Sequence, residues 1–168
     1  MNSEQETSVA LRPAVFEDAH GITLALLESA EHHARLDPER YFVPAFDTLF
    51  TRYQNRIREL RSGTSSEIML VAEQNGEIVG FIEAKLEQSP DPMHRSMTFC
   101  HVGEIVVRGQ HRSQGIGAQL VRGVEDWGRE HGADFVSLEY HIANTRAASF
   151  YQRKMGYGPA AVTAIKRL

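Results

Sequence analysis

Two glycines and an arginine lie where an apolar run gives way to a helical pattern, at "RSQGIGA" (112–118). The first four N–H groups of a helix have no partner within it, and glycine has no side chain to keep a ligand away. Phosphate oxygens bind well at such a turn. Because one anion contact with the helix dipole contributes only about 0.3 to 1 kcal/mol, several amides and a cation such as Arg112 would have to act together. The pattern predicts a phosphate site, with a glycine-rich connection that holds no ligand as the alternative.

The residues after the glycines separate this turn from two nucleotide-binding motifs. A P-loop requires Gly-Lys-Ser/Thr, whereas Gly117 is followed by Ala118 and Gln119. A dinucleotide fingerprint requires a third glycine where this chain has Leu120, and it belongs to the first strand-turn-helix unit rather than to a late one. Neither motif is predicted here.

Glu104 is the first candidate for proton transfer, because it stands in an otherwise apolar strand. Burial there would raise the pKa of its carboxyl group toward neutrality, which suits a general base. A structural carboxylate paired with an arginine is an equal alternative. If the strand alternates regularly, Glu104 and Val106 share one face, and Ile105 and Val107 share the other.

Tyr151 is the second candidate. It follows Asn144 and Ala148 at helical spacing, so the three side chains share one helix face. A tyrosine there can act as a general acid. The alternative is a core or half-buried tyrosine whose hydroxyl meets a backbone carbonyl.

For the other reactive side chains, the sequence favours ordinary structural roles. His32 and His33 with Asp37 could suggest a metal site, but adjacent histidines point to different helix faces and no second cluster completes a ligand set, so no metal is predicted. Cys100 has no cationic neighbour in the sequence and is read as a small buried hydrophobe rather than a nucleophile.

Composition limits the class of protein. The chain has 168 residues, 42% hydrophobic and 24% charged, which suits one globular domain with its own core. A net charge of −4 argues against nucleic acid or an anionic membrane as the main partner. One cysteine excludes an intrachain disulfide, and the polar first residues do not resemble a signal peptide. We expect a cytoplasmic protein.

Hydrophobic periodicity predicts one α+β domain with a mainly antiparallel sheet. Asn75-Gly76 predicts a tight hairpin turn. The helix at 115–131 joins two neighbouring strands that should be parallel. The predicted helices cover 18–37, 46–60, 115–131 and 144–155, and the predicted strands cover 9–14, 67–74, 77–87, 97–107, 135–142 and 161–168.

Several motifs in this order resemble the GNAT N-acetyltransferase superfamily. "RSQGIG" is similar to its pyrophosphate loop R/Q-x-x-G-x-G/A, "NTRAASFY" (144–151) to its N-x-x-A-x-x-F/L-Y pattern, and "MGY" to the Gly-aromatic that follows. "LRPAVFEDAHGI" and "NGEIVGFIEA" look like its opening strand and helix and its central hairpin. The resemblance covers residues 8–168, after a segment 1–7 that we expect to be flexible. It implies six to seven strands with splayed central strands, flanked by about four helices.

The resemblance also implies a reaction, the transfer of an acetyl group from acetyl-CoA to a primary amine by direct attack in a ternary complex, without a metal. In this reading Tyr151 protonates the CoA thiolate and Glu104 acts as the base. A non-catalytic acyl-CoA-binding or regulatory protein of the same fold is the alternative. The family usually has four steps between this tyrosine and the following glycine, whereas five separate Tyr151 from Gly156, so a one-residue bulge is expected.

The cofactor-binding residues follow from the resemblance. The loop amides would hold the pyrophosphate and the preceding strand would bind the pantetheine arm like an added strand. A homodimer is also implied. The residues concerned are Arg112, Ser113, Gln114, Gly115, Ile116, Gly117 and Ala118 for the pyrophosphate, Ile105, Val106 and Val107 for the arm, and Asn144. Arg146, Arg153 and Lys154 either reach the 3′-phosphate of CoA or form a solvated face.

The acceptor wall in this family is formed by the first two helices and their connection. Here that segment, 31–47, carries carboxylates and aromatic rings, which suggests a cationic amine. The same residues could be core and surface, and the acceptor stays open between a small amine, an antibiotic and a peptide or protein amine. His101 and His141, expected in strands beside the cleft, either touch substrate or pack in the core. The wall residues are Glu31, Asp37, Glu39, Asp47, Tyr41, Phe42 and Phe46.

Overall fold

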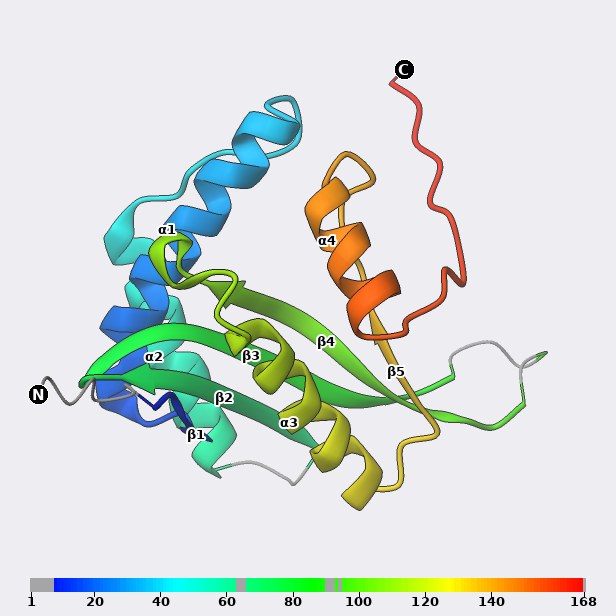
Figure 1. Cartoon of the computed structure of the whole chain (residues 1–168), viewed down its shortest axis with the longest axis horizontal. Helices are drawn as coiled ribbons and strands as arrows, with labels where there is room; N and C mark the ends of the chain where they lie inside the picture. The colour runs from blue at the N-terminus through cyan, green and yellow to red at the C-terminus, as the bar shows by residue number, and fades with distance from the viewer. Residues whose placement is uncertain (1–7, 63–65, 90–92, 94, 168) are drawn as a thin grey trace, which may run out of the picture.

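The computed structural model describes residues 8–62, 66–89, 93 and 95–167 (Figure 1). The expectation of a flexible 1–7 segment lies outside this part of the chain. No helix within these ranges combines the length and apolar content needed to cross a bilayer. The elements are β1 (Ala10–Pro13), α1 (Ala19–Leu36), α2 (Phe46–Ser62), β2 (Glu67–Gln74), β3 (Glu77–Gln88), β4 (Thr98–Val107), α3 (Ile116–Glu130), β5 (Phe135–Leu138) and α4 (Thr145–Ser149), with short turns η1 (Phe16–Asp18), η2 (Gly109–His111) and the π-helical η3 (Phe150–Lys154).

The sheet has the strand order β1-β2-β3-β4-β5. The first four strands are antiparallel, and β4 and β5 are parallel because α3 connects them, as predicted. Asn75 and Gly76 have φ of 54° and 81°, the two positive values that a tight hairpin turn requires. The α+β fold class predicted from the sequence is therefore confirmed.

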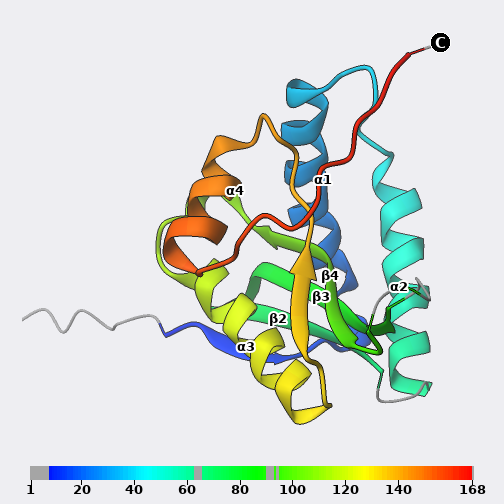
Figure 2. The ribbon, with the colours of Figure 1, turned by 90° about the vertical axis from the view of Figure 1, so that its right-hand side faces the viewer.

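Two hydrophobic cores lie on opposite faces of the sheet. Figure 2 shows α1 and α2 on one side and α3 on the other. Phe81 of β3 is fully buried under α2, where its ring meets that of Tyr53 edge to face at 5.7 Å. Ile82, the next residue, belongs to the core under α3. The core on the α1–α2 side includes Ile22, Leu26, Ile57, Val71 and Val106, and the core on the α3 side includes Cys100, Val102, Leu120, Val121 and Val124.

A β-bulge in β4 changes which face its residues occupy. The register with β3 shifts between Val102 and Glu104, so Gly103 is an extra residue. Before the bulge, Val102 packs on the α3 side, and after it Val106 packs on the α1–α2 side. If the strand alternated regularly through Gly103, Glu104 would lie on the same face as Val102. The bulge therefore turns Glu104 toward α2.

The two parallel strands pair over only four residues. Phe99 to Val102 of β4 face Phe135 to Leu138 of β5, and the strands then separate. Figure 1 shows β4 continuing toward α1 while the chain after β5 leads to α4. Within the described residues, the last part of β4 has no strand partner on this side. The predicted splay is thus present.

Two strand predictions were wrong. The strand predicted at 135–142 ends at Leu138, because β4 has already moved away from it. The segment 161–167 forms no strand, and its residues are exposed; residue 168 lies outside the described part. A strand needs a neighbour for its backbone groups, and the pattern "AVTAI" cannot supply one. The described sheet therefore has five strands instead of six to seven.

We expect Phe81→Ala to lower the free energy of unfolding by about 3 to 5 kcal/mol, since it leaves a cavity under α2. Urea denaturation followed by circular dichroism measures this change. Phe42, which is 76% exposed, is the matched control, and Phe42→Ala should change stability by less than about 0.5 kcal/mol. Equal effects at the two positions would contradict the assignment of Phe81 to the core.

Candidate active site

The glycine turn lies between the end of β4 and the start of α3, as predicted. Ser113 and Gly115 both have positive φ, 65° and 83°. Gly115 is the N-cap and has no side chain to cap the helix, and a Cβ placed on it would meet nothing within 4 Å. The first helical bond runs from the Gln119 amide to the Gly115 carbonyl at 3.1 Å. The amides of 116–118 therefore lack helical partners, and the space beside Gly115 is open.

Glu28 of α1 holds the approach to this turn in place. One carboxylate oxygen accepts from the Gly109 amide at 2.7 Å, and the other accepts from Arg108 Nε at 3.0 Å. Burial acts to raise the pKa of Glu28, but the Gly109 amide and the Arg108 guanidinium outweigh it and hold the pKa below its usual value. The carboxylate thus stays ionised and ties η2 to α1.

Two arginines lie beside the turn. Arg112 Nε donates to the Val107 carbonyl at 2.9 Å, which holds the guanidinium at the end of β4. Arg146 of α4 donates to Ser113 Oγ at 3.3 Å. The turn thus combines unpartnered amides with two cations, which suits a polyphosphate.

The end of β4 presents backbone groups on its open side. The Arg108 amide donates to the Val79 carbonyl, and Val106 is paired with β3. Since backbone groups alternate along a strand, those of Ile105 and Val107 point away from β3. The Val107 carbonyl accepts from Arg112, and the Ile105 amide interacts with the Glu104 carboxylate, which leaves the Ile105 carbonyl as the group on this side with no partner among the described residues. An amide-bearing ligand could pair here like an added strand.

Tyr151 lies in a cluster of aromatic rings. Its ring stacks on Tyr140 at 5.5 Å and meets Tyr157 edge to face at 6.0 Å. The residue is buried, and no hydrogen bond of its hydroxyl is found within the described part of the chain. Burial, and secondarily the charge of Glu104, raise the pKa of Tyr151 to about 12. The phenol is therefore protonated at neutral pH and able to donate.

The extra residue between Tyr151 and Gly156 forms the expected bulge. The α-helical turn of α4 passes into the π-helical η3. The Met155 amide donates to the Phe150 carbonyl, five residues back, at 3.1 Å. A π-helical turn accommodates one additional residue in this way. Gly156, with φ of 79°, then ends the helix.

Asn144 caps α4. Its side-chain oxygen accepts from the Ala147 amide at 3.0 Å, which satisfies one of the first-turn donors. Its side chain is thus engaged within the protein, and its assignment as a cofactor-binding residue stays a prediction.

Glu104 lies opposite Glu83 of β3. Burial, and secondarily the charge of Glu83, raise the pKa of Glu104 to about 7, while Arg52 acts in the opposite direction. No ion pair of Glu104 is found among the described residues, which leaves the alternative of an arginine-paired structural carboxylate without support. The raised pKa lets this carboxyl group exchange a proton near neutral pH.

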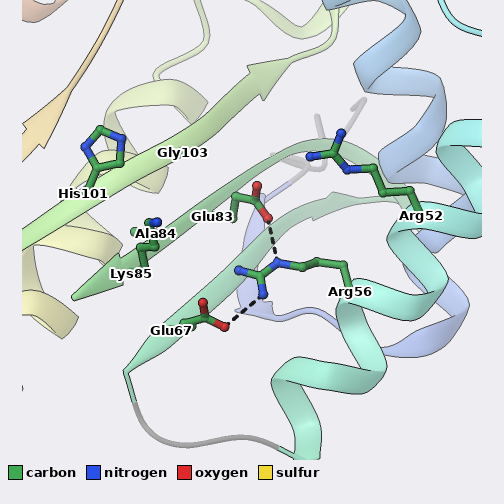
Figure 3. A pocket seen from close by; sticks show the side chains of 8 residues that line it. All are labelled: Arg52, Arg56, Glu67, Glu83, Ala84, Lys85, His101 and Gly103. Carbon is green, nitrogen blue, oxygen red and sulfur yellow. Dashed lines mark hydrogen bonds and ion pairs between the residues drawn. The ribbon is translucent and has the colours of Figure 1, made fainter. Parts of the chain in front are cut away.

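A polar hollow of about 480 Å³ lies between α2 and the sheet (Figure 3). This hollow was not predicted from the sequence. The available signal was that Phe81, Glu83 and Lys85 share one face of β3, which changes along the strand from apolar to charged. Arg56 pairs with Glu67 at 2.9 Å and with Glu83 at 3.6 Å. The hollow is lined by Arg52, Arg56, Glu67, Glu83, Ala84, Lys85, His101 and Gly103.

The acids of the α1–α2 connection are largely neutralised. Asp37 pairs with Arg40 and lies 3.4 Å from His141. Glu39 pairs with Arg167 at 3.3 Å. His141 lies beyond the end of β5, not in a strand as expected. The excess negative charge predicted for this wall is therefore reduced. Carboxylates without a close partner occur instead at Glu83, which is 3.6 Å from Arg56, and at Glu104.

The remaining candidates have structural contacts. His33 Nδ1 contacts the Ser29 carbonyl at 2.9 Å, and His101 Nδ1 contacts Ser137 Oγ at 3.1 Å. Burial raises the pKa of the Cys100 thiol to about 11, which makes it a poor nucleophile. Across the described ranges, no three metal-ligating side chains come together.

Comparisons with known proteins agree with this geometry. The Acetyltransferase (GNAT) family matches residues 30–157. The aminoalkylphosphonate N-acetyltransferase of Salmonella typhimurium is 33% identical over 87 residues, which are 52% of this chain and 54% of that protein. The chain spans about half the length of the curated relatives it matches.

Solved structures show the same fold. The tetramutant of the BH1408 protein from Bacillus halodurans has a TM-score of 0.83 and 20% identity, and the match covers 95% of this chain and 99% of that one. The aminoglycoside N-acetyltransferase AAC(6')-Iy in complex with CoA has a TM-score of 0.68 and 15% identity, and the match covers 99% of both chains. With the family match extending over most of its length and this fold around the site, the chain belongs to the Acetyltransferase (GNAT) family.

Proposed function

We propose that the chain transfers an acetyl group from acetyl-CoA to a primary amine by direct attack in a ternary complex. The observation that carries the proposal is the separation of β4 from β5 after Val102. It leaves a backbone edge that leads to the amides of the glycine turn at one end, with Glu104 and Tyr151 beside it and electrostatically coupled. The acetyltransferase activities named for the relatives support the same reaction.

The donor would be held largely by groups that the fold leaves without partners. The Arg112 amide is an exception, since it donates to the Gly109 carbonyl at 3.3 Å. The amides of residues 112–118 would bind the pyrophosphate, with Arg112 and Arg146 as the nearby cations. Ile105 and Val107 would pair with the pantetheine amides. The backbone groups of Val106 face β3 and would not pair with the pantetheine arm. Val106 would only hold its two neighbours in position.

Glu104 would prepare the nucleophile. An alkyl ammonium with a pKa near 10.4 is neutral in only about one molecule in 2,500 at pH 7. With its pKa raised to about 7, Glu104 takes the first proton, which makes the amine neutral. The amine nitrogen then forms a bond to the acetyl carbonyl carbon, and the bond from that carbon to sulfur breaks.

Tyr151 would stabilise the departing sulfur. Its pKa of about 12 exceeds the thiol value of about 8.5, so complete proton transfer from the phenol to the thiolate is uphill. The hydroxyl therefore acts mainly by donating a hydrogen bond as the charge develops. Forming the amide releases a second proton from the nitrogen, so that of the two protons the ammonium loses, one ends on the thiol and the other passes to solvent.

Tyr151→Phe should lower kcat by about 100-fold or more, because it removes this donor without changing the ring. The dissociation constant for CoA should stay within about twofold. Thiol release from acetyl-CoA and isothermal titration calorimetry measure the two quantities. Tyr157→Phe is the control, since its hydroxyl is bonded to Glu125 at 2.9 Å. Unchanged kcat in Tyr151→Phe would contradict the role of this hydroxyl as a donor to the departing sulfur. CoA binding without turnover on any amine would favour the non-catalytic alternative.

Glu104→Gln should change the pH dependence of both stability and rate. A carboxyl whose folded pKa is raised binds more protons folded than unfolded between pH 4.5 and about 7, so it makes the free energy of unfolding fall as pH rises through this range, by up to about 1.4 kcal/mol per pH unit. Urea denaturation from pH 5 to 8 should show this slope in the unaltered protein and lose it in the variant. In the variant kcat/KM should also lose its rise near pH 7. An identical slope in both proteins would contradict the assignment of the raised pKa to Glu104.

CoA should bind at least about tenfold more tightly than pantetheine. Pantetheine has the same arm but no pyrophosphate, so it cannot make the charge-assisted contacts at the glycine turn. Thermal denaturation can follow this, since a ligand at 100 times its dissociation constant adds about 2.7 kcal/mol of stability. Equal binding of the two ligands would remove the pyrophosphate role from residues 112–118.

A further inference from the structure

The polar hollow lies beside the proposed base. Glu83, which lines it, is the cross-strand neighbour of Glu104. Figure 3 shows Arg52 and Arg56 extending from α2 toward the sheet, where Glu83 lies. An acceptor amine delivered to Glu104 would therefore have this hollow beside it to receive the rest of the molecule.

Most charges around the hollow are already paired. Arg56 is committed to Glu67 by a hydrogen bond of 2.9 Å. Lys85 pairs with Glu87, outside the hollow, at 2.6 Å. These pairs leave little net charge to attract a ligand.

Two groups remain without adequate partners. Oε2 of Glu83 is buried and accepts no hydrogen bond from the described residues, because its nearest cation, Arg56 Nε, is 3.6 Å away. Within the described ranges, Arg52 makes no ion pair or hydrogen bond. The first group needs a donor, since an unsatisfied buried carboxylate oxygen is costly. The second offers a planar guanidinium that matches a carboxylate or phosphate.

Resting on the acetyl transfer proposed above, we propose that the acceptor is a small zwitterion: an amine whose far end carries an anionic group. Its ammonium end would lie against Glu83 and Glu104, and its anionic end would bind Arg52. An acceptor with a second cation at its far end would place that cation against Arg52 and Lys85. An acceptor with a neutral far end would leave the guanidinium of Arg52 without a hydrogen-bond acceptor. A carboxylate pair that faces a spare guanidinium is complementary to a ligand with both charges.

Three acceptors of similar length test this proposal: 3-aminopropanoate, 3-aminopropanamide and 1,3-diaminopropane, each with acetyl-CoA. We expect kcat/KM for 3-aminopropanoate to exceed that for the other two by at least about tenfold, the size of one charge-assisted contact. Arg52→Gln should remove most of this preference through KM. Because Arg52 also lowers the pKa of Glu104, any change in kcat should be the same for all three acceptors. Arg52→Lys should restore part of the preference.

Arg58→Gln is the matched control, because Arg58 is on the same helix but packs over Phe16 at 4.6 Å, away from the hollow. It should leave all three kcat/KM values within about twofold. A preference for 1,3-diaminopropane, or an Arg52→Gln variant that lowers all three equally, would overturn the zwitterion proposal while leaving acetyl transfer intact. Failure with all three acceptors would also overturn it. Thiol release on a wider amine panel and CoA binding then decide separately whether acetyl transfer stands.

Discussion

The separation of β4 from β5 is the feature on which the rest of the site depends. A strand in the middle of a sheet normally satisfies its backbone groups on both sides. Here β4 loses one neighbour after Val102, and its open edge runs directly into the glycine turn. A flat, fully paired sheet would close this edge. The same divergence explains why β5 is short, because its only described neighbour leaves after four residues.

Two one-residue irregularities, the β-bulge in β4 and the π-helical turn η3, orient the side chains proposed to react. The bulge at Gly103 moves Glu104 from the α3 side of the sheet to the α2 side, where burial and Glu83 raise its pKa. The π-helical turn takes up the residue that would otherwise displace Gly156 relative to Tyr151. Both features interrupt regular hydrogen bonding, and both occur at the proposed centre of proton transfer. Such interruptions are frequently found at functional sites, where they redirect one side chain.

Charge is distributed unevenly between the two ends of the proposed site. At the donor end, Arg112 and Arg146 adjoin bare amides, and Glu28 neutralises Arg108 without reaching the turn itself. On the other side of the sheet, arginine and carboxylate side chains mostly cancel around the hollow. An acceptor would meet the charges that are not fully compensated, chiefly Arg52 and the weakly paired Glu83. The ends thus differ in the ligand charge that they favour.

Local chemistry was enough to predict much of this protein. Asn75-Gly76 determined a hairpin because few residues tolerate positive φ twice, the apolar period determined α1, α2 and α3, and the residue types at 112–118 marked the glycine turn that precedes α3. The pairing of Glu83 with Glu104, the neutralisation of Asp37, and the absence of a strand at 161–167 were decided only by the tertiary structure. Each of these features depends on a partner distant in the chain. A local pattern gives the structural propensity of a segment but does not identify the segment that it packs against.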